Sequence, residues 1–89
     1  MQGATFDEFK AMIAESREIE YAFGGHEYFY QRSWAGDAFE VYVLCDGKQV
    51  FHERNTSMDV ITSKALSLRS YNGKAAEEAQ EGIAVTFEA

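Results

Sequence analysis

The stretch from Glu18 to Asn55 constrains the fold most, because it holds three two-residue turn signals between runs of alternating residues. These signals are Gly24-Gly25, Gly36-Asp37 and Asp46-Gly47. Such pairs readily adopt the left-handed backbone that two-residue β-hairpins require. The stretch therefore predicts a meander of four antiparallel strands.

The two-residue loops also predict the register of the strands. In this register the third loop pairs Cys45 with Lys48, Val43 with Val50 and Val41 with His52. Side chains alternate between the two faces of a sheet, so each pairing assigns a face. All three hairpins place their apolar residues on one side, the inner face, which collects Ile19, Tyr21, Phe23, Tyr28, Tyr30, Trp34, Phe39, Val41, Val43, Cys45 and Val50.

One helix is predicted before the meander in the sequence and another after it. Thr5 and Glu8 form a capping box, and an apolar stripe predicts a helix from there to about Ser16. Thr56 or Ser57 can cap a second helix that runs to about Leu66. The fold class is α+β, with an N-terminal helix, an antiparallel four-stranded meander, and one or two C-terminal helices packed on one sheet face.

The C-terminal part is predicted less sharply. Residues 74–81 contain strong helix formers, and Gly82 would end that helix. Residues 84–89 alternate apolar and polar side chains, which is consistent with a last strand or an extended tail. A length of 89 residues indicates one domain over residues 1–89.

Composition narrows the classes of function. One cysteine excludes an internal disulfide and a cysteine-rich zinc site. The sequence holds no apolar run of about 20 residues and no secretion signal at its start, so we expect a cytoplasmic protein without membrane contact. A net charge of −7 disfavours direct binding of nucleic acid and allows a basic partner, although solubility alone is the simpler explanation of the charge.

Candidates for catalysis are weak in this register. Cys45 and His52 share the inner face, but His52 lies opposite Val41 and thus four residues away from the thiol. Glu40 and Glu53 face each other on an open surface without an enclosing pocket. The histidines lie too far apart to share a metal ion. We therefore expect a protein that is not an enzyme, with no catalytic residues, no metal and no cofactor.

The other side of the sheet, the outer face, carries an unusual patch. Its predicted centre is aromatic and apolar, and consists of Phe29, Tyr42, Leu44 and Phe51. Its predicted rim is acidic and consists of Glu20, Glu27, Glu40 and Glu53, and the register turns no lysine or arginine outward from the strands. An apolar centre with a charged rim is typical of protein-binding surfaces.

The leading interpretation is a small non-enzymatic domain that binds a protein partner through this face. Three structural alternatives stay open: the segment from Lys74 covers the face, the face forms a homodimer, or a sheet simply retains some aromatic residues. Two functional alternatives also remain. One is an acidic inhibitor that mimics nucleic acid, and the other is a small enzyme without a recognisable motif.

Four segments carry a resemblance to known proteins, namely TFDEFKAMI, REIEYAFGGHEYFY, SMDVITSKAL and NGKAAEEAQEGI. Their layout resembles small uncharacterised acidic helix–meander–helix proteins of gut Firmicutes and of their phages and mobile elements, and this likeness implies no activity. In shape and charge the chain is also similar to small phage anti-CRISPR inhibitors of Cas9. That likeness implies an acidic surface that occupies a basic nucleic-acid site.

Overall fold

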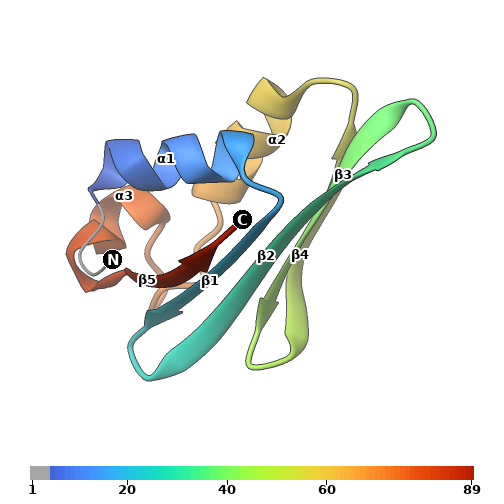
Figure 1. Cartoon of the computed structure of the whole chain (residues 1–89). Helices are drawn as coiled ribbons and strands as arrows, with labels where there is room; N and C mark the ends of the chain where they lie inside the picture. Colours follow the sequence, from blue (N-terminus) through green and yellow to red (C-terminus); the bar gives the residue numbers. More distant parts are fainter. Residues whose placement is uncertain (1–4) are drawn as a thin grey trace.

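The three predicted hairpins all form in the computed structural model, which describes residues 5–89 (Figure 1). The fold is α+β, as expected. In chain order the elements are α1 (Phe6–Glu15), β1 (Glu18–Phe23), β2 (His26–Ala35), β3 (Ala38–Cys45), β4 (Lys48–Asn55), α2 (Met58–Leu66), α3 (Ala76–Ala79), the 3₁₀ turn η1 (Gln80–Gly82) and β5 (Ala84–Glu88).

Backbone geometry explains the tight turns. Gly24 and Gly25 have φ angles of 59° and 82°, and Asp46 and Gly47 have 51° and 82°. Positive φ at both central residues is the pattern of type I′ turns, whose twist matches that of the strands. The predicted register is confirmed across the first two hairpins, for example at Tyr21 with Tyr28, and at Tyr30 with Val43.

The C-terminal residues form a fifth strand. β5 pairs antiparallel with β1, so the sheet order is β4-β3-β2-β1-β5. Ala89 continues this pairing, because its backbone NH donates to the carbonyl of Glu18 over 2.9 Å. The alternative of an unpaired tail is therefore wrong, and the meander has a partner strand at its first edge.

The predicted register of β4 is confirmed for Cys45 with Lys48 and for Leu44 with Gln49, and it is wrong from there on. Between these pairs and the next, Val50 is an extra residue on β4, so this bulge sets Val43 opposite Phe51, whereas the prediction set it opposite Val50. One extra residue shifts every later side chain to the opposite face. Val50 is exposed, while Phe51 packs against the core. The bulge thus places a large aromatic ring over the inner face where a smaller valine was expected.

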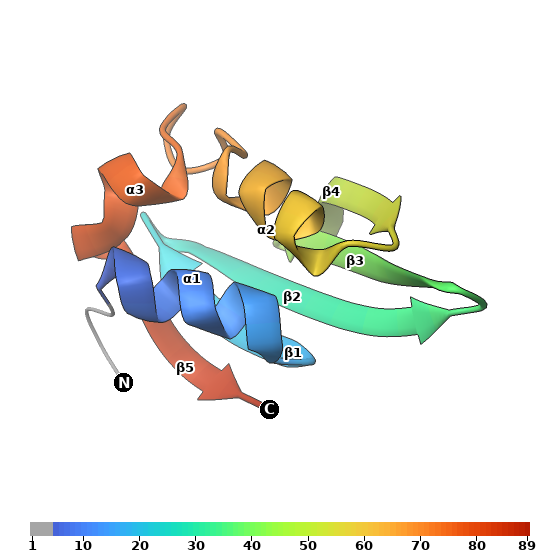
Figure 2. The ribbon, with the colours of Figure 1, turned by 90° about the horizontal axis from the view of Figure 1, so that it is seen from above.

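Trp34 is a second departure from the expected core. It faces the inner side, as predicted, but it remains 59% exposed. Its ring makes an edge contact with Phe39 at 4.9 Å, and the Arg32 guanidinium lies over that phenyl ring. These residues lie toward the end of the β2–β3 hairpin, which projects away from the helices in Figures 1 and 2.

The helices begin where the sequence predicts. The Thr5 side chain accepts from the NH of Glu8 while the Glu8 carboxylate accepts from the NH of Thr5, which completes the capping box. Ser57 caps α2. Figures 1 and 2 show α1, α2 and α3 on the same face of the sheet. None of the helices within residues 5–89 has the length and apolar character needed to cross a membrane.

The core lies between these helices and the inner face. The five residues that the sequence places most firmly in it are all nearly inaccessible to solvent, namely Phe9, Ile13, Tyr21, Val41 and Val43. Tyr42 and Leu44 point the opposite way and are only half-buried. The predicted assignment of inner and outer faces is therefore confirmed for β1, β2 and β3.

The core makes a first prediction. Ile13 and Val43 are each 2% exposed, so truncating either one to alanine leaves a cavity and should lower the free energy of unfolding by about 1–4 kcal/mol. Val60→Ala is the matched control, because Val60 is 40% exposed on α2, and it should stay within about 0.5 kcal/mol. Urea denaturation followed by circular dichroism measures all three. Equal losses for Val60 and Ile13 would contradict this description of the core.

Candidate functional site: the outer face of the sheet

The outer face has no element packed on it among residues 5–89. Figure 1 shows every helix on the opposite side of the sheet. The segment from Lys74 to Ala89 runs through α3 on the helix side and then forms β5 at the sheet edge. The alternative in which this segment covers the outer face is therefore wrong.

Three of the four predicted central residues lie on this face. Phe29 pairs with Leu44 and Tyr42 lies in the next row, and all three are half-buried. Phe51 does not belong with them, because the bulge in the β3–β4 pairing turns its side chain inward onto the core. The apolar centre is thus confirmed as a structural feature on β2 and β3 and does not extend to β4 in the predicted way.

Phe87 is a member of the patch that the sequence prediction missed. It lies opposite Glu20 on the outer face and is 45% exposed. Strict alternation would have put Phe87 on the inner side with Val85, but a bulge between Glu20 and Tyr21 in the β1–β5 pairing reverses its direction. The alternation of apolar and polar residues in 84–89 predicted a strand, but no residue in that segment predicts the bulge.

The acidic rim is only partly as predicted. Glu20 and Glu27 are exposed on the outer face, and neither carboxylate has an ion pair within the described part of the chain. Glu53 is on the inner side, where it pairs with Lys64 of α2. The rim therefore gathers at the β1–β2 half of the sheet.

Glu40 lies on the outer face but has partners there. It faces Arg54 on β4, so the expectation that no cation points outward is wrong. The His52 imidazole contacts the Glu40 carboxylate at 2.9 Å and stacks on Tyr42, with ring centroids 4.6 Å apart. The hydrogen bond from His52 is the main cause that lowers the pKa of the Glu40 carboxyl, and the Tyr42 hydroxyl adds to it.

A hollow of about 350 Å³ lies on the outer face near the first and third turns. Phe29, Leu44 and Ala22 contribute apolar surface to it, while Glu20, Glu27 and Asp46 contribute carboxylates. The pKa of Asp46 is lowered, mainly because its carboxylate accepts the backbone NH of Glu27, so the group stays charged near neutral pH. The hollow thus combines apolar walls with negative charge.

The catalytic candidates are arranged differently from the prediction. His52 lies on the outer face, opposite Tyr42, whereas Cys45 belongs to the inner face. The structure therefore keeps this pair on opposite sides of the sheet. Instead it brings His26, Cys45 and Asp46 together at the end of the meander, a grouping that the sequence prediction missed. The signal was present, because the first and third turns of a meander lie at the same end.

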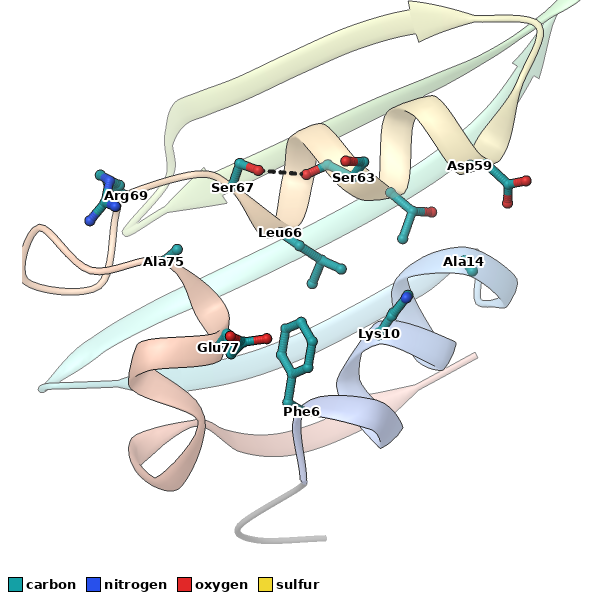
Figure 3. A pocket seen from close by; sticks show the side chains of 11 residues that line it. Phe6, Lys10, Ala14, Asp59, Ser63, Leu66, Ser67, Arg69, Ala75 and Glu77 are labelled. Atoms are coloured by element: carbon teal, nitrogen blue, oxygen red, sulfur yellow. Dashed lines mark hydrogen bonds between the residues drawn. The ribbon is translucent and has the colours of Figure 1, made fainter.

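A second concave region lies on the helix side, between α1, α2 and the start of α3, with a volume of about 700 Å³ (Figure 3). Figure 3 shows Phe6 and Leu66 pointing toward each other across it. Its charges are of both signs, from Lys10, Arg69, Asp59 and Glu77. Thr62 also lines it, and the Thr62 hydroxyl is buried without a hydrogen-bond partner among the described residues. This region selects for no single ligand charge.

Comparison of the chain with family models, curated proteins and solved structures finds no match.

The environment of Glu40 makes a second prediction. His52→Phe keeps a ring on Tyr42 but removes the hydrogen bond, so the pKa of Glu40 should rise toward its ordinary value. A carboxyl group whose pKa is lowered by folding stabilises the fold at pH values above its ordinary pKa, and this stabilisation is lost as the pH falls through the lowered pKa. In the variant, the free energy of unfolding should therefore depend less on pH in this acidic range. Carbon-13 NMR titration of the carboxyls measures the shift, and the Asp46 pKa, which depends on Glu27 and His26, should not move.

The Thr62 hydroxyl makes a third prediction. Replacing it with the methyl group of valine removes an unpaired buried oxygen without changing the shape of the side chain, so Thr62→Val should stabilise the fold by up to about 1 kcal/mol. Thr62→Ala, which also removes a methyl group, should instead destabilise it. Thermal denaturation compares the two variants. If Thr62→Val is less stable than Thr62→Ala, the Thr62 hydroxyl makes a hydrogen bond in the folded protein and the prediction is wrong.

Proposed function

We propose that this protein is a non-enzymatic recognition domain that binds a basic partner protein on its outer face. The observation that supports this most is the hollow, where Glu20 and Glu27 lie beside Phe29 and Leu44 without counter-charges from residues 5–89. A lysine or arginine side chain suits such a place. Its aliphatic stem can lie on the apolar residues while its charge meets the carboxylates.

Two further aromatic side chains lie on the outer face, next to residues that line the hollow. Phe87 reaches the face from β5, and Tyr42 lies on β3 in the row next to Leu44. Large rings of this kind carry much of the affinity in protein interfaces. The net charge of −7 would speed the approach of a basic partner and make association sensitive to salt.

The same charges disfavour the two main alternatives. A twofold dimer through this face would bring the carboxylates of two copies together, and like charges facing each other across an interface cost affinity. A mimic of nucleic acid needs a continuous negative surface, whereas Arg54 lies opposite Glu40 on this face. A partner with isolated basic residues next to apolar ones fits better.

The fourth prediction tests this function. Selection of a phage-displayed random peptide library on the full chain should enrich peptides with lysine or arginine next to an aromatic or aliphatic residue. For a synthetic copy of an enriched peptide, the double variant Glu20→Gln, Glu27→Gln should weaken binding at least ~10-fold. Fluorescence anisotropy at two salt concentrations measures the affinity, which should fall as salt rises.

A charge-matched control separates the face from the overall charge. Glu15→Gln with Glu81→Gln removes the same charge from exposed positions in α1 and η1, and binding should be retained. Enrichment without basic residues, or equal losses in both double variants, would contradict the proposal. So would sedimentation showing a dimer that Phe29→Glu dissociates, because the occupant of the face would then be a second copy of the chain.

A further inference from the structure

Two hairpin turns meet at one end of the sheet and bring three metal-binding side-chain types together. His26 follows the Gly24-Gly25 turn at the start of β2, Cys45 ends β3, and Asp46 is the first residue of the next turn. One nitrogen, the sulfur and one carboxylate oxygen from these residues all lie within 4.8 Å of one another. The cluster joins positions that are about 20 residues apart in sequence, as the contact between His26 and Asp46 shows.

The backbone holds the carboxylate of this cluster in place. The NH of Asp46 donates to the carbonyl of Glu27 over 2.7 Å, and the NH of Glu27 donates to Asp46 Oδ1 over 2.9 Å. This reciprocal pair leaves Oδ2 directed at His26 Nδ1, at 2.6 Å. An outer contact that orients a ligand oxygen in this way is a regular feature of metal sites in proteins.

We propose that His26, Cys45 and Asp46 form a binding site for a zinc-like transition-metal ion. Zinc binds imidazole, thiolate and carboxylate at about 2.0–2.3 Å, which sets tetrahedral donors roughly 3.3–3.8 Å apart. Donor atoms already within 4.8 Å reach that arrangement by small side-chain rotations. The thiolate and imidazole donors exclude calcium and magnesium, which prefer sites built from oxygen alone.

Access to the site is also suitable. The side chains of His26 and Asp46 are 52% and 50% exposed, and Cys45 is partly buried. An ion can therefore enter from solvent, and water can occupy the fourth position of a site with three protein ligands. Because the ligands come from two hairpins, a bound ion would tie the first turn to the third.

The protons of the ligands balance simply. Cys45 releases its thiol proton to solvent and binds as the thiolate. In the free protein His26 Nδ1 carries the hydrogen that it donates to Asp46 Oδ2, over 2.6 Å. When the ion binds, neutral His26 moves this proton through solvent to Nε2, so the lone pair of Nδ1 binds the ion in place of the hydrogen. The contact between Nδ1 and Oδ2 then opens to the separation of two ligands on one metal.

The fifth prediction tests this site with Co²⁺ and Zn²⁺ on the full chain, prepared without a polyhistidine tag and stripped of metal. Co²⁺ should produce a thiolate-to-metal charge-transfer absorption, and because the chain has one cysteine this absorption reports on Cys45 alone. Cys45→Ser should abolish the absorption. His26→Ala should weaken Zn²⁺ binding, measured by calorimetry, at least ~10-fold. Zn²⁺ should also slow the alkylation of Cys45 in the unmodified chain, a readout that needs no variant.

His52→Phe is the control, since it removes the other histidine, which contacts Glu40 in the same way but has no thiol beside it in the described residues. Its Zn²⁺ affinity should equal that of the parent chain. The absence of the cobalt absorption, unchanged affinity in His26→Ala, or equal losses in His52→Phe would overturn the proposal. The variant Glu20→Gln, Glu27→Gln should bind Zn²⁺ normally, so failure of the metal site and failure of the recognition face are distinguishable.

Discussion

Burial of four tyrosines under the helices is the interaction on which the rest of this structure depends. Tyr21, Tyr28 and Tyr30 come from β1 and β2, and Tyr71 comes from the segment after α2. The rings of Tyr21 and Tyr28 stack with centroids 5.0 Å apart.

Each buried ring contributes much apolar area, but its hydroxyl must find a hydrogen-bond partner. The partners of these hydroxyls set where the covering segments lie. Tyr30 donates to the carbonyl of Ile13 in α1 over 2.5 Å, and Tyr28 donates to the carbonyl of Ser70 over 2.9 Å.

Tyr71 completes this arrangement, because its hydroxyl lies 2.8 Å from that of Tyr21. Burial raises the pKa of both Tyr30 and Tyr71 to about 12, so both stay neutral hydrogen-bonding groups across the physiological range. Within residues 5–89 all the helices lie on this side of the sheet, as Figure 2 shows, and none lies on the outer face. The proposed recognition face, formed by Phe29, Leu44, Glu20 and Glu27, follows from that asymmetry, whereas the proposed metal site lies at the end of the sheet where the first and third turns meet. Asp46 belongs to both, since it lines the hollow and contacts His26.

The central strands could be predicted because two local signals agree there. Turn residues with positive φ set the loop length, and alternation assigns Tyr21, Tyr28 and Val43 to one face. The edge strands could not be predicted in the same way. Both β4 and β5 contain an irregularity in their pairing, and these irregularities moved Phe51 inward and Phe87 outward. Bulges are common at sheet edges, where strands pair on one side only and bend more easily.

By itself the sequence determined the class of the fold, the helix start at Thr5, the start of α2 to within one residue, and the register of β1, β2 and β3. These features depend on interactions between residues close in the chain, so a short window of sequence contains the cause. Only the tertiary structure decided the edge registers and the need for glycine at position 82, where an added Cβ would lie 2.6 Å from the Phe23 ring. A bulge gives up regular pairing locally and is stabilised by distant contacts, such as Phe51 on the core and Glu53 with Lys64. The lost pairing is local, whereas the contacts that stabilise the bulge come from residues far away in the chain, so no short stretch of sequence predicts the outcome.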